Sequence, residues 1–296
     1  MQCVRPISIR NPANFSGVTI SYDGNLPYIV ETGESPEPRI LVPCGKCVVC
    51  QENRRNAWAA RLELEARTSA CSYFATLTYN DESRPGELCL EHLQKFIKRA
   101  RKSIPFRFFA CGEYGDTFGR EHFHIALFFA DKHEFGEIYA LLNDKWRFGF
   151  VKLDSLTWNR CRYVAKYTIK QLFSVPDGKI PPFAVMSRRP GIGFDYFDGS
   201  RQYCRDYLVL ENGQHQALPR YFLDKLDPVE AIAVKRHCRE YAEALPKISE
   251  TEKMLRNLNL ERSLKRNYIK KHGRAETRES ACGAQVPQAA ERQESA

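Results

Sequence analysis

Residues 71–175 alternate between short runs rich in aromatic and β-branched residues and longer amphipathic runs, and this order constrains the fold most. The predicted strands are 72–79, 106–113, 122–129 and 148–153. The predicted helices are 53–70, 90–103, 135–142 and 159–173, the last of them capped by Thr157 or Asn159. Glycines 115 and 119 separate the second and third strands and indicate a hairpin. Adjacent antiparallel strands joined by helices predict an α+β fold with a central antiparallel sheet flanked by helices.

The rest of the chain is organised around this core, which we place at 71–175. Segment 1–70 is predicted to hold loops, short strands, a cysteine-rich zinc-knuckle-like stretch and the first helix. Segment 176–271 is a C-terminal extension that is punctuated by proline and glycine as far as 199, with helices predicted at 227–243 and 250–271. Segment 272–296 has few large apolar residues, so we predict a disordered tail.

Two histidines and one carboxylate form the first candidate site. His122 and His124 are two residues apart on a predicted strand, so they point to the same face with Cα atoms about 7 Å apart. The hairpin brings Glu113, near the end of the preceding strand, alongside them. Two imidazoles and a carboxylate can hold Mg²⁺ or Mn²⁺ and leave positions open for water and a phosphate oxygen. The structural alternative is a pair of surface histidines.

Two tyrosines and two lysines on the last core helix form the second. Tyr163 and Tyr167 are separated by one helical turn, so both hydroxyls can reach a single phosphate. Lys166 and Lys170 follow each tyrosine by three residues and can neutralise phosphate charge. A phenol with a pKa near 10 needs such a cation or a polarised phosphate in order to react as a nucleophile. The structural alternative is a pair of core tyrosines with solvated lysines.

Basic residues point to nucleic acid as a partner. The chain carries a formal net charge of +9 with a pI of about 9.0. The polar face of the helix 90–103 concentrates five of the cations, which are predicted to grip DNA phosphates: Lys95, Lys98, Arg99, Arg101 and Lys102. Asn80 and Asp81, in the turn after the first core strand, are a secondary candidate contact with DNA.

Cys44, Cys47 and Cys50 form a cluster with the spacing of a structural zinc site. A fourth ligand is required, and Cys3 is the preferred candidate, followed by Cys71. A redox-active or incidental cluster is the alternative. Arg54 and Arg55, directly behind the cluster, could contact the DNA backbone.

Several classes of protein are disfavoured. The sequence has no apolar run near the ~20 residues of a membrane span, and residues 1–10 lack the apolar stretch of a signal peptide. Its odd number of cysteines, eleven, fits reduced thiols better than a disulfide framework. We therefore expect a soluble intracellular protein. The phosphate-binding loop of a helicase, Gly-x₄-Gly-Lys-Ser/Thr, does not occur.

Several segments together resemble the motifs of HUH endonucleases, and especially of the replication initiators of the Microviridae, in their gokushovirus-like branch. The matching segments are Ala75-Thr-Leu-Thr-Tyr79-Asn-Asp81, Gly112-Glu-Tyr-Gly115 with Gly119-Arg-Glu-His-Phe-His124, Tyr163-Val-Ala-Lys-Tyr-Thr-Ile-Lys170, Arg188-Arg-Pro-Gly-Ile-Gly193 and Leu218-Pro-Arg-Tyr221. The resemblance spans residues 40–225 approximately. One position departs from the pattern: Glu121 precedes the first histidine, where relatives more often have glycine or a similar residue, and it either tunes the site or faces solvent.

The resemblance implies a rolling-circle replication initiator that nicks and joins single-stranded or origin DNA through a 5′-phosphotyrosyl intermediate. His122, His124 and Glu113 would then hold the metal, and Tyr163 and Tyr167 would be alternating nucleophiles supported by Lys166 and Lys170. The implied partners are a host helicase and polymerase in the bacterial cytoplasm. The alternatives are another HUH enzyme, such as a relaxase or transposase, and a zinc-containing DNA-binding regulator without catalysis.

Overall fold

The computed structural model of the chain describes residues 3, 6–10, 19–23, 26–30, 39–115, 119–168, 178–199, 208–209, 215–244, 254–255, 258–259 and 262. It divides into two compact units, Met1–Lys247 and Ile248–Ala296. The described helices include none that is both long and apolar enough to cross a bilayer.

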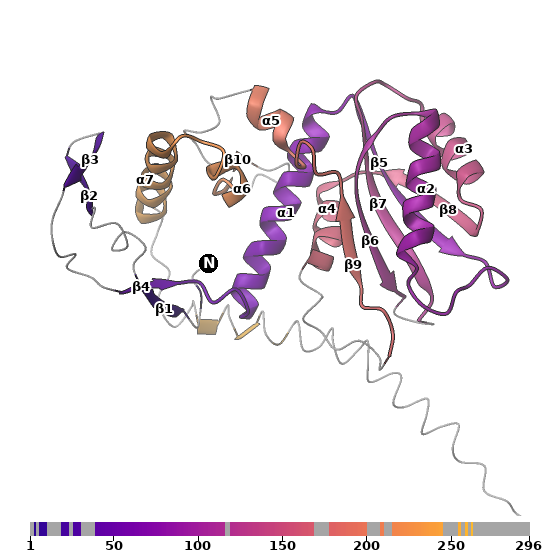
Figure 1. The fold of residues 1–296 in the computed structure, drawn as a ribbon, viewed down its shortest axis with the longest axis horizontal. Helices are drawn as coiled ribbons and strands as arrows, with labels where there is room; N and C mark the ends of the chain where they lie inside the picture. The colour runs from indigo at the N-terminus through magenta and orange to yellow at the C-terminus, as the bar shows by residue number, and fades with distance from the viewer. Residues whose placement is uncertain are drawn as a thin grey trace, which may run out of the picture. The chain divides into compact units, whose positions relative to one another are not determined.

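A five-stranded antiparallel sheet is the centre of the first unit (Figure 1). Its strands are β5 (Cys71–Tyr79), β6 (Arg107–Tyr114), β7 (Glu121–Phe129), β8 (Gly149–Ser155) and β9 (Phe183–Met186). They lie in the spatial order β8-β5-β7-β6-β9, and every neighbouring pair is antiparallel. The predicted central antiparallel sheet is therefore confirmed, and the predicted hairpin is the β6–β7 pair.

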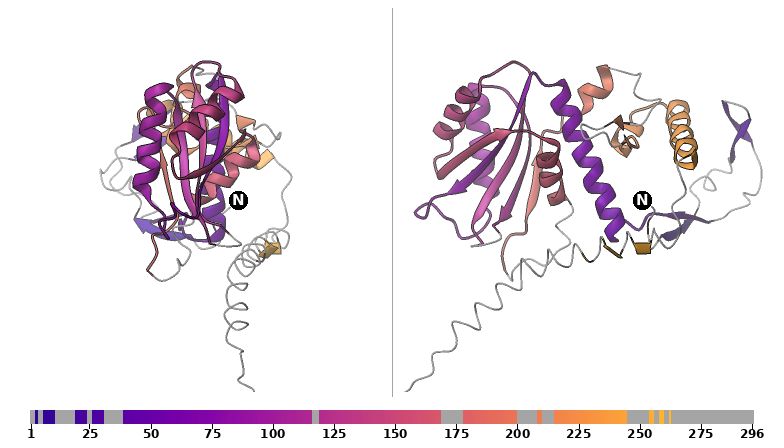
Figure 2. Two further views of the ribbon diagram at one scale, coloured as in Figure 1. Left: turned by 90° about the vertical axis from the view of Figure 1, so that its right-hand side faces the viewer. Right: turned by 180° about the vertical axis from the view of Figure 1, so that it is seen from behind.

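Strand alternation gives this sheet two apolar faces, and helices cover both of them. The face that carries Phe74 and Phe128 packs against α1 (Val48–Thr68) and α4 (Trp158–Ala165). The opposite face, with Leu77 and Ile125, packs against α2 (Leu90–Ser103) and α3 (Phe135–Lys145). Figures 1 and 2 show the two pairs of helices on opposite sides of the sheet. We call them the α1/α4 face and the α2/α3 face.

The core elements form where hydrophobic periodicity predicts them, with shifts of a few residues at their ends. α2 has the predicted bounds and buries the predicted apolar residues Leu93, Phe96, Ile97 and Ala100. Thr157 caps α4, because its side chain accepts a hydrogen bond from the Arg160 N–H.

Two predictions about this region were wrong. The helix expected at 159–173 is α-helical only as far as Ala165, and a 3-10 turn, η2 (Lys166–Thr168), follows. The Thr168 hydroxyl donates to the Ala165 carbonyl at 2.7 Å, as befits a helix end that tightens. The stretch expected to lack regular structure up to 199 contains β9, which pairs with β6, and the short helix α5 (Phe194–Gly199).

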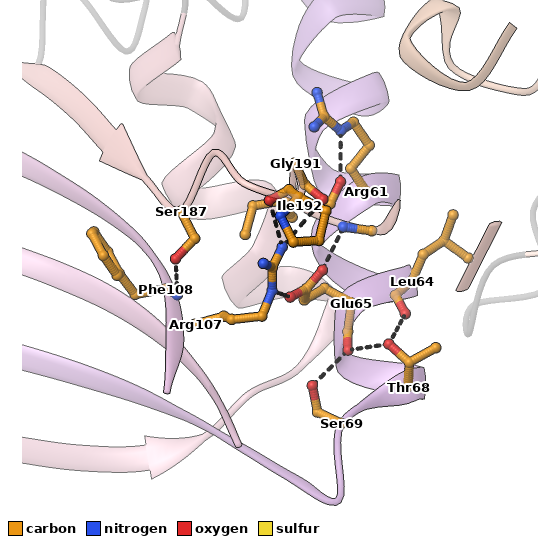
Figure 3. Close-up of polar contacts among 12 residues, drawn as sticks. Arg61, Leu64, Glu65, Thr68, Ser69, Arg107, Phe108, Ser187, Gly191 and Ile192 are labelled. Atoms are coloured by element: carbon orange, nitrogen blue, oxygen red, sulfur yellow. Dashed lines mark hydrogen bonds and ion pairs between the residues drawn. The ribbon is translucent and has the colours of Figure 1, made fainter. Parts of the chain in front are cut away.

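A buried carboxylate fastens residues 187–193 to α1 and β6 (Figure 3). Glu65 is 1% exposed, forms an ion pair with Arg107 of β6, and accepts a hydrogen bond from the Gly193 N–H at 2.5 Å. Arg107 also donates to the carbonyls of Pro190 and Gly191. Gly193 has φ +82°, and a Cβ there would lie 2.9 Å from the Arg61 carbonyl oxygen, so this close approach requires glycine.

The segment 218–221 joins the same junction. Arg61 of α1 donates to the Ile192 carbonyl at 3.0 Å, and its guanidinium lies 4.1 Å from the Trp58 ring centroid and 3.8 Å from that of Tyr221. The segments 188–193 and 218–221 therefore contact one helix.

The remaining described elements are short or peripheral to the sheet. They are β1 (Ile7–Arg10), β2 (Thr19–Asp23), β3 (Leu26–Val30), β4 (Arg39–Val42), β10 (Leu208–Val209), β11 (His215–Gln216), α6 (Arg220–Leu223) and α7 (Pro228–Ala244). α7 confirms the helix predicted at 227–243. Of the helix predicted at 250–271, only residues 254–255, 258–259 and 262 are described, and they are helical. The tail predicted at 272–296 lies outside the described residues.

Candidate active site

Glu113, His122 and His124 converge on the α1/α4 face of the sheet. Glu113 is the cross-strand partner of His122, and strand alternation puts His124 on the same side. The Glu113 Oε1 atom lies 3.0 Å from His122 Nε2 and 2.8 Å from His124 Nε2. The three groups could hold one metal ion, since their donor atoms all lie within 4.8 Å of one another.

The other nitrogen of each imidazole is engaged by a second partner. His122 Nδ1 lies 3.1 Å from the Arg120 carbonyl oxygen, and His124 Nδ1 lies 2.9 Å from Thr76 Oγ1. Such contacts fix the ring orientation and leave Nε2 directed into the site, as is usual for histidines that bind metals. Sequence reasoning missed Thr76, because the only signal was its place on the strand that precedes Asn80.

Burial and hydrogen bonding shift the proton affinities in this cluster. Burial by itself would raise the pKa of the Glu113 carboxyl, but hydrogen bonds from His122, His124 and Tyr163 hold that pKa well below its usual range. Burial lowers the pKa of His124, although Glu113 opposes this shift. An ionised carboxylate and a neutral imidazole are the forms that bind a divalent cation.

Both candidate tyrosines reach this cluster from α4 and η2. The Tyr163 hydroxyl donates to Glu113 Oε1 at 2.5 Å, and the Tyr167 hydroxyl lies 3.4 Å from the Tyr163 hydroxyl. Tyr163 is 38% exposed, whereas Tyr167 is fully buried. Lys166 Nζ lies 3.8 Å from the ring centroid of Tyr163 and 5.0 Å from that of Tyr167. Lys170 lies outside the described residues.

An ion pair between two helices holds α4 in place. Arg162, next to Tyr163, donates to Glu52 Oε1 of α1 at 2.7 Å. Glu52 is buried and also pairs with Arg55, so Arg55 has a structural partner. Arg54 is exposed. Sequence reasoning missed Glu52, because its partner in α4 lies far away along the chain.

The cysteines form a second cluster at the start of α1. Cys3 Sγ lies 3.5 Å from Cys44 Sγ and 3.7 Å from Cys47 Sγ, and Cys44 Sγ lies 4.0 Å from Cys50 Sγ. These four thiols could also hold a metal ion. Cys71 is elsewhere, with its thiol 3.4 Å from the Asp131 carbonyl oxygen. Backbone N–H groups of Cys47 and Lys46 lower the pKa of Cys44, and burial raises the pKa of Cys50 to about 12.

The basic helix α2 lies on the α2/α3 face, on the side of the sheet away from Glu113 and Tyr163. Its cations differ in their surroundings. Arg99 donates to the Lys145 carbonyl at 3.0 Å, and Lys95 pairs with Glu91. Lys98, Arg101 and Lys102 are exposed. The DNA-binding role of these residues stays a prediction.

Glu121 points away from the candidate site, and the suggestion that it faces solvent was wrong. Its side chain is 0% exposed and lies on the α2/α3 face, because it alternates with His122 along β7. Both carboxylate oxygens accept from Arg84, at 2.9 and 3.2 Å. This pair ties the loop before α2 to the β6–β7 hairpin. Asp81, in the same loop, pairs with Arg120 at 2.7 Å.

Comparison with known proteins finds viral replication proteins. Residues 72–172 match the family model of replication-associated protein ORF2. The chain is 31% identical over 266 residues to replication-associated protein ORF2 of Spiroplasma virus 4, covering 75% of this chain and 79% of that protein. It is 29% identical over 250 residues to replication-associated protein VP4 of Bdellovibrio phage phiMH2K, covering 76% of each. Replication-associated protein ORF4 of Chlamydia phage 1 is 31% identical over 214 residues, which cover 62% of this chain and 53% of that protein.

Proposed function

The chain belongs to the replication-associated proteins of Microviridae-type phages, and from that premise we propose that it starts rolling-circle replication as a metal-dependent, two-tyrosine DNA nickase of the HUH type. The single observation that carries the proposal is the 2.5 Å contact between the Tyr163 hydroxyl and Glu113 Oε1, which joins a nucleophile to a cluster of metal-binding groups.

The donor set fits a divalent cation. One carboxylate and two imidazoles, oriented by Arg120 and Thr76, supply three ligands. Glu113, His122 and His124 would hold Mg²⁺ or Mn²⁺, which supplies charge stabilisation to a phosphodiester when bound.

Tyr163 is the nucleophile that lies nearest to this cluster. Its oxygen forms a bond to phosphorus while the bond from phosphorus to the 3′ oxygen breaks. The 3′ oxygen takes up a proton and becomes the primer terminus, and the tyrosine proton passes to solvent. One phosphoester replaces another, so nicking needs no ATP. The Lys166 ammonium beside the Tyr163 ring stabilises the negative charge that develops on the phenolic oxygen.

Tyr167 serves the second transfer. After one round of synthesis, its hydroxyl attacks the regenerated origin, and the released 3′ hydroxyl displaces Tyr163 from the first phosphate, closing a unit-length circle. The 3.4 Å separation of the two hydroxyls is compatible with successive use of one phosphate position. Lys170 is proposed to support the same phosphate.

The wider role follows from the family. We propose that the protein binds single-stranded and origin DNA in the host bacterial cytoplasm and relies on a host helicase and polymerase. Cys3, Cys44, Cys47 and Cys50 are proposed to hold a structural zinc ion, which would fasten the N-terminal residues to the start of α1.

Incubation of the protein with its own circular genome tests the proposal. With Mg²⁺ or Mn²⁺ we expect a nicked circle that carries covalently bound protein, and peptide mapping should find DNA on Tyr163 or Tyr167. Tyr139→Phe, which changes an exposed tyrosine on α3, is the control and should nick normally. An adduct on Tyr79 or Tyr114 would overturn the assignment of the nucleophile. Nicking without any adduct would mean a hydrolytic nuclease.

A further inference from the structure

The α1/α4 face of the sheet presents an exposed aromatic ring in line with the candidate metal ligands. Phe150 of β8 is 66% exposed, the largest value for an aromatic side chain in the part of the chain that the structure describes. It pairs across the strands with Thr78, Thr78 pairs with His122, and His122 pairs with Glu113. Cross-strand partners point to the same face, so these four side chains form one row.

The backbone fixes the position of Phe150 in that row. Gly149 has φ +150°, and a Cβ there would lie 2.4 Å from the Thr78 carbonyl oxygen and from the Asn80 nitrogen. β8 can therefore begin this close to β5 only with glycine at 149. Val151, the next residue, is buried on the α2/α3 face, which leaves Phe150 on the opposite side.

A cation stands beside the ring on the same face. Lys152, two residues along β8, pairs across the strands with Thr76, and Thr76 pairs with His124. The Lys152 side chain is 74% exposed, and its ammonium lies 3.7 Å from Asp154, a long contact at an open surface. The face therefore offers an apolar ring, two threonines and an exposed ammonium next to the metal ligands.

We propose that Phe150 stacks on an unpaired base of the DNA strand near the scissile phosphate, while Lys152 contacts the strand's backbone. The inference rests on the proposed function, which brings a single strand to this face. Two strand spacings separate Phe150 from His122, about 10 Å, so the stacked base belongs to a nucleotide close to the phosphate at the site. An aromatic platform with a nearby cation is the general means of holding single-stranded DNA. Duplex DNA has no unstacked base to offer.

Binding without cleavage tests this inference separately from the proposed function. The probe is a short fluorescein-labelled oligo(dT), titrated by anisotropy in EDTA so that no nicking occurs. Phe150→Ala should weaken binding about tenfold, the usual size of the effect when one stack is removed. Phe150→Leu should weaken it similarly, since leucine is apolar but cannot stack, whereas Phe150→Trp should retain binding. Tyr139→Ala, at another exposed aromatic residue that lies on α3, is the matched control and should bind as the wild type does.

Two further readouts identify the contact. An abasic strand of the same length should bind wild type and Phe150→Ala equally, because it has no base to stack. Lys152→Ala should lower the slope of log Kobs against log salt by about 0.7, the value for one phosphate of a single strand. Equal affinity of wild type and Phe150→Ala for oligo(dT) would overturn the inference, even if nicking were intact. So would a change in self-association at unchanged DNA affinity, which would assign the face to a second copy of the chain.

Discussion

Tyr163 and Tyr167 are one helical turn apart, yet their surroundings differ. Tyr163 is partly exposed and donates to Glu113, whereas Tyr167 is buried among the residues that pack α4 and η2 against α1. A substrate phosphate at the cluster meets Tyr163 first. Tyr167 reaches the same position only through a rearrangement of the hydroxyls.

This difference predicts unequal effects of the two tyrosine substitutions. Tyr163→Phe should slow nicking of a short oligonucleotide by about 10- to 100-fold, because the remaining hydroxyl is less well placed. Tyr167→Phe should retain most of the first nick, yet fail in repeated strand-transfer cycles. The double variant should form no covalent adduct. Single-turnover nicking and multiple-round circle production measure the two effects, and equal nicking by the double variant would refute the assignment.

The histidines separate chemistry from binding. His122→Ala and His124→Ala should each lower cleavage by at least about 100-fold, since each removes a proposed metal ligand. Affinity for DNA should change little, because phosphate contacts from lysine and arginine supply most of it. His133→Ala is the control, as His133 pairs with Glu137 away from the cluster. Undiminished cleavage by the double histidine variant would exclude this metal site.

The sequence predicted the residues of this cluster better than it predicted their support. His122 and His124 alternate on a strand, and the hairpin allowed Glu113 to be paired with them before the register was known. Thr76 and Glu52 act through contacts with residues 48 and 110 positions away, which no periodicity reveals. The exposure of Phe150 was hidden for the same reason, because it depends on what the sheet leaves uncovered.

At the scale of elements, amphipathic periodicity predicted α2 fully and the four central strands closely. β9 gave no such signal, since it is four residues long and every one of them is only partly buried. It exists because the edge of β6 pairs with it, and because Ser187 and the segment after it are bound to β6 and α1. That stabilisation is tertiary and leaves no local pattern.

The Glu65 junction should therefore contribute strongly to stability. Glu65→Ala leaves Arg107 without its carboxylate and the Gly193 N–H without an acceptor, so we expect a loss of about 3 kcal/mol in the free energy of unfolding. Urea denaturation measures it. Glu91→Ala breaks the exposed pair with Lys95 on α2 and should cost less than about 1 kcal/mol. Equal effects of the two changes would show that the junction adds no more than a surface pair.

The cysteine cluster makes a prediction for the start of α1. Purified protein should contain about one zinc ion per chain by elemental analysis, and Cys44→Ser should lose that zinc and lower the midpoint of thermal unfolding. Cys71→Ser should retain the metal, because that thiol lies outside the cluster. Fully folded protein without zinc would contradict the proposed role.

At the scale of the molecule, the positive charge is not confined to the candidate site. α2 carries exposed cations on the α2/α3 face, across the sheet from the nucleophiles. A short strand at the α1/α4 face does not need to contact them, whereas a long or duplex origin has phosphates to spare for a second surface. The two faces thus make separable contributions to binding.

Replacement of Lys95, Lys98, Arg101 and Lys102 by alanine tests this separation. The variant should nick a short oligonucleotide at the wild-type rate, because α2 is remote from Glu113 and Tyr163. Its affinity for origin duplex should fall, and the slope of log Kobs against log salt should decrease by about 0.9 for each phosphate that is no longer bound. Arg99 is left in place, since it donates to the Lys145 carbonyl and its removal would disturb folding. Lys132→Ala, at an exposed lysine outside α2, is the control for a general charge effect. An unchanged salt slope would remove α2 from the DNA-binding surface, and slower nicking of the short strand would mean that α2 acts on the reaction itself.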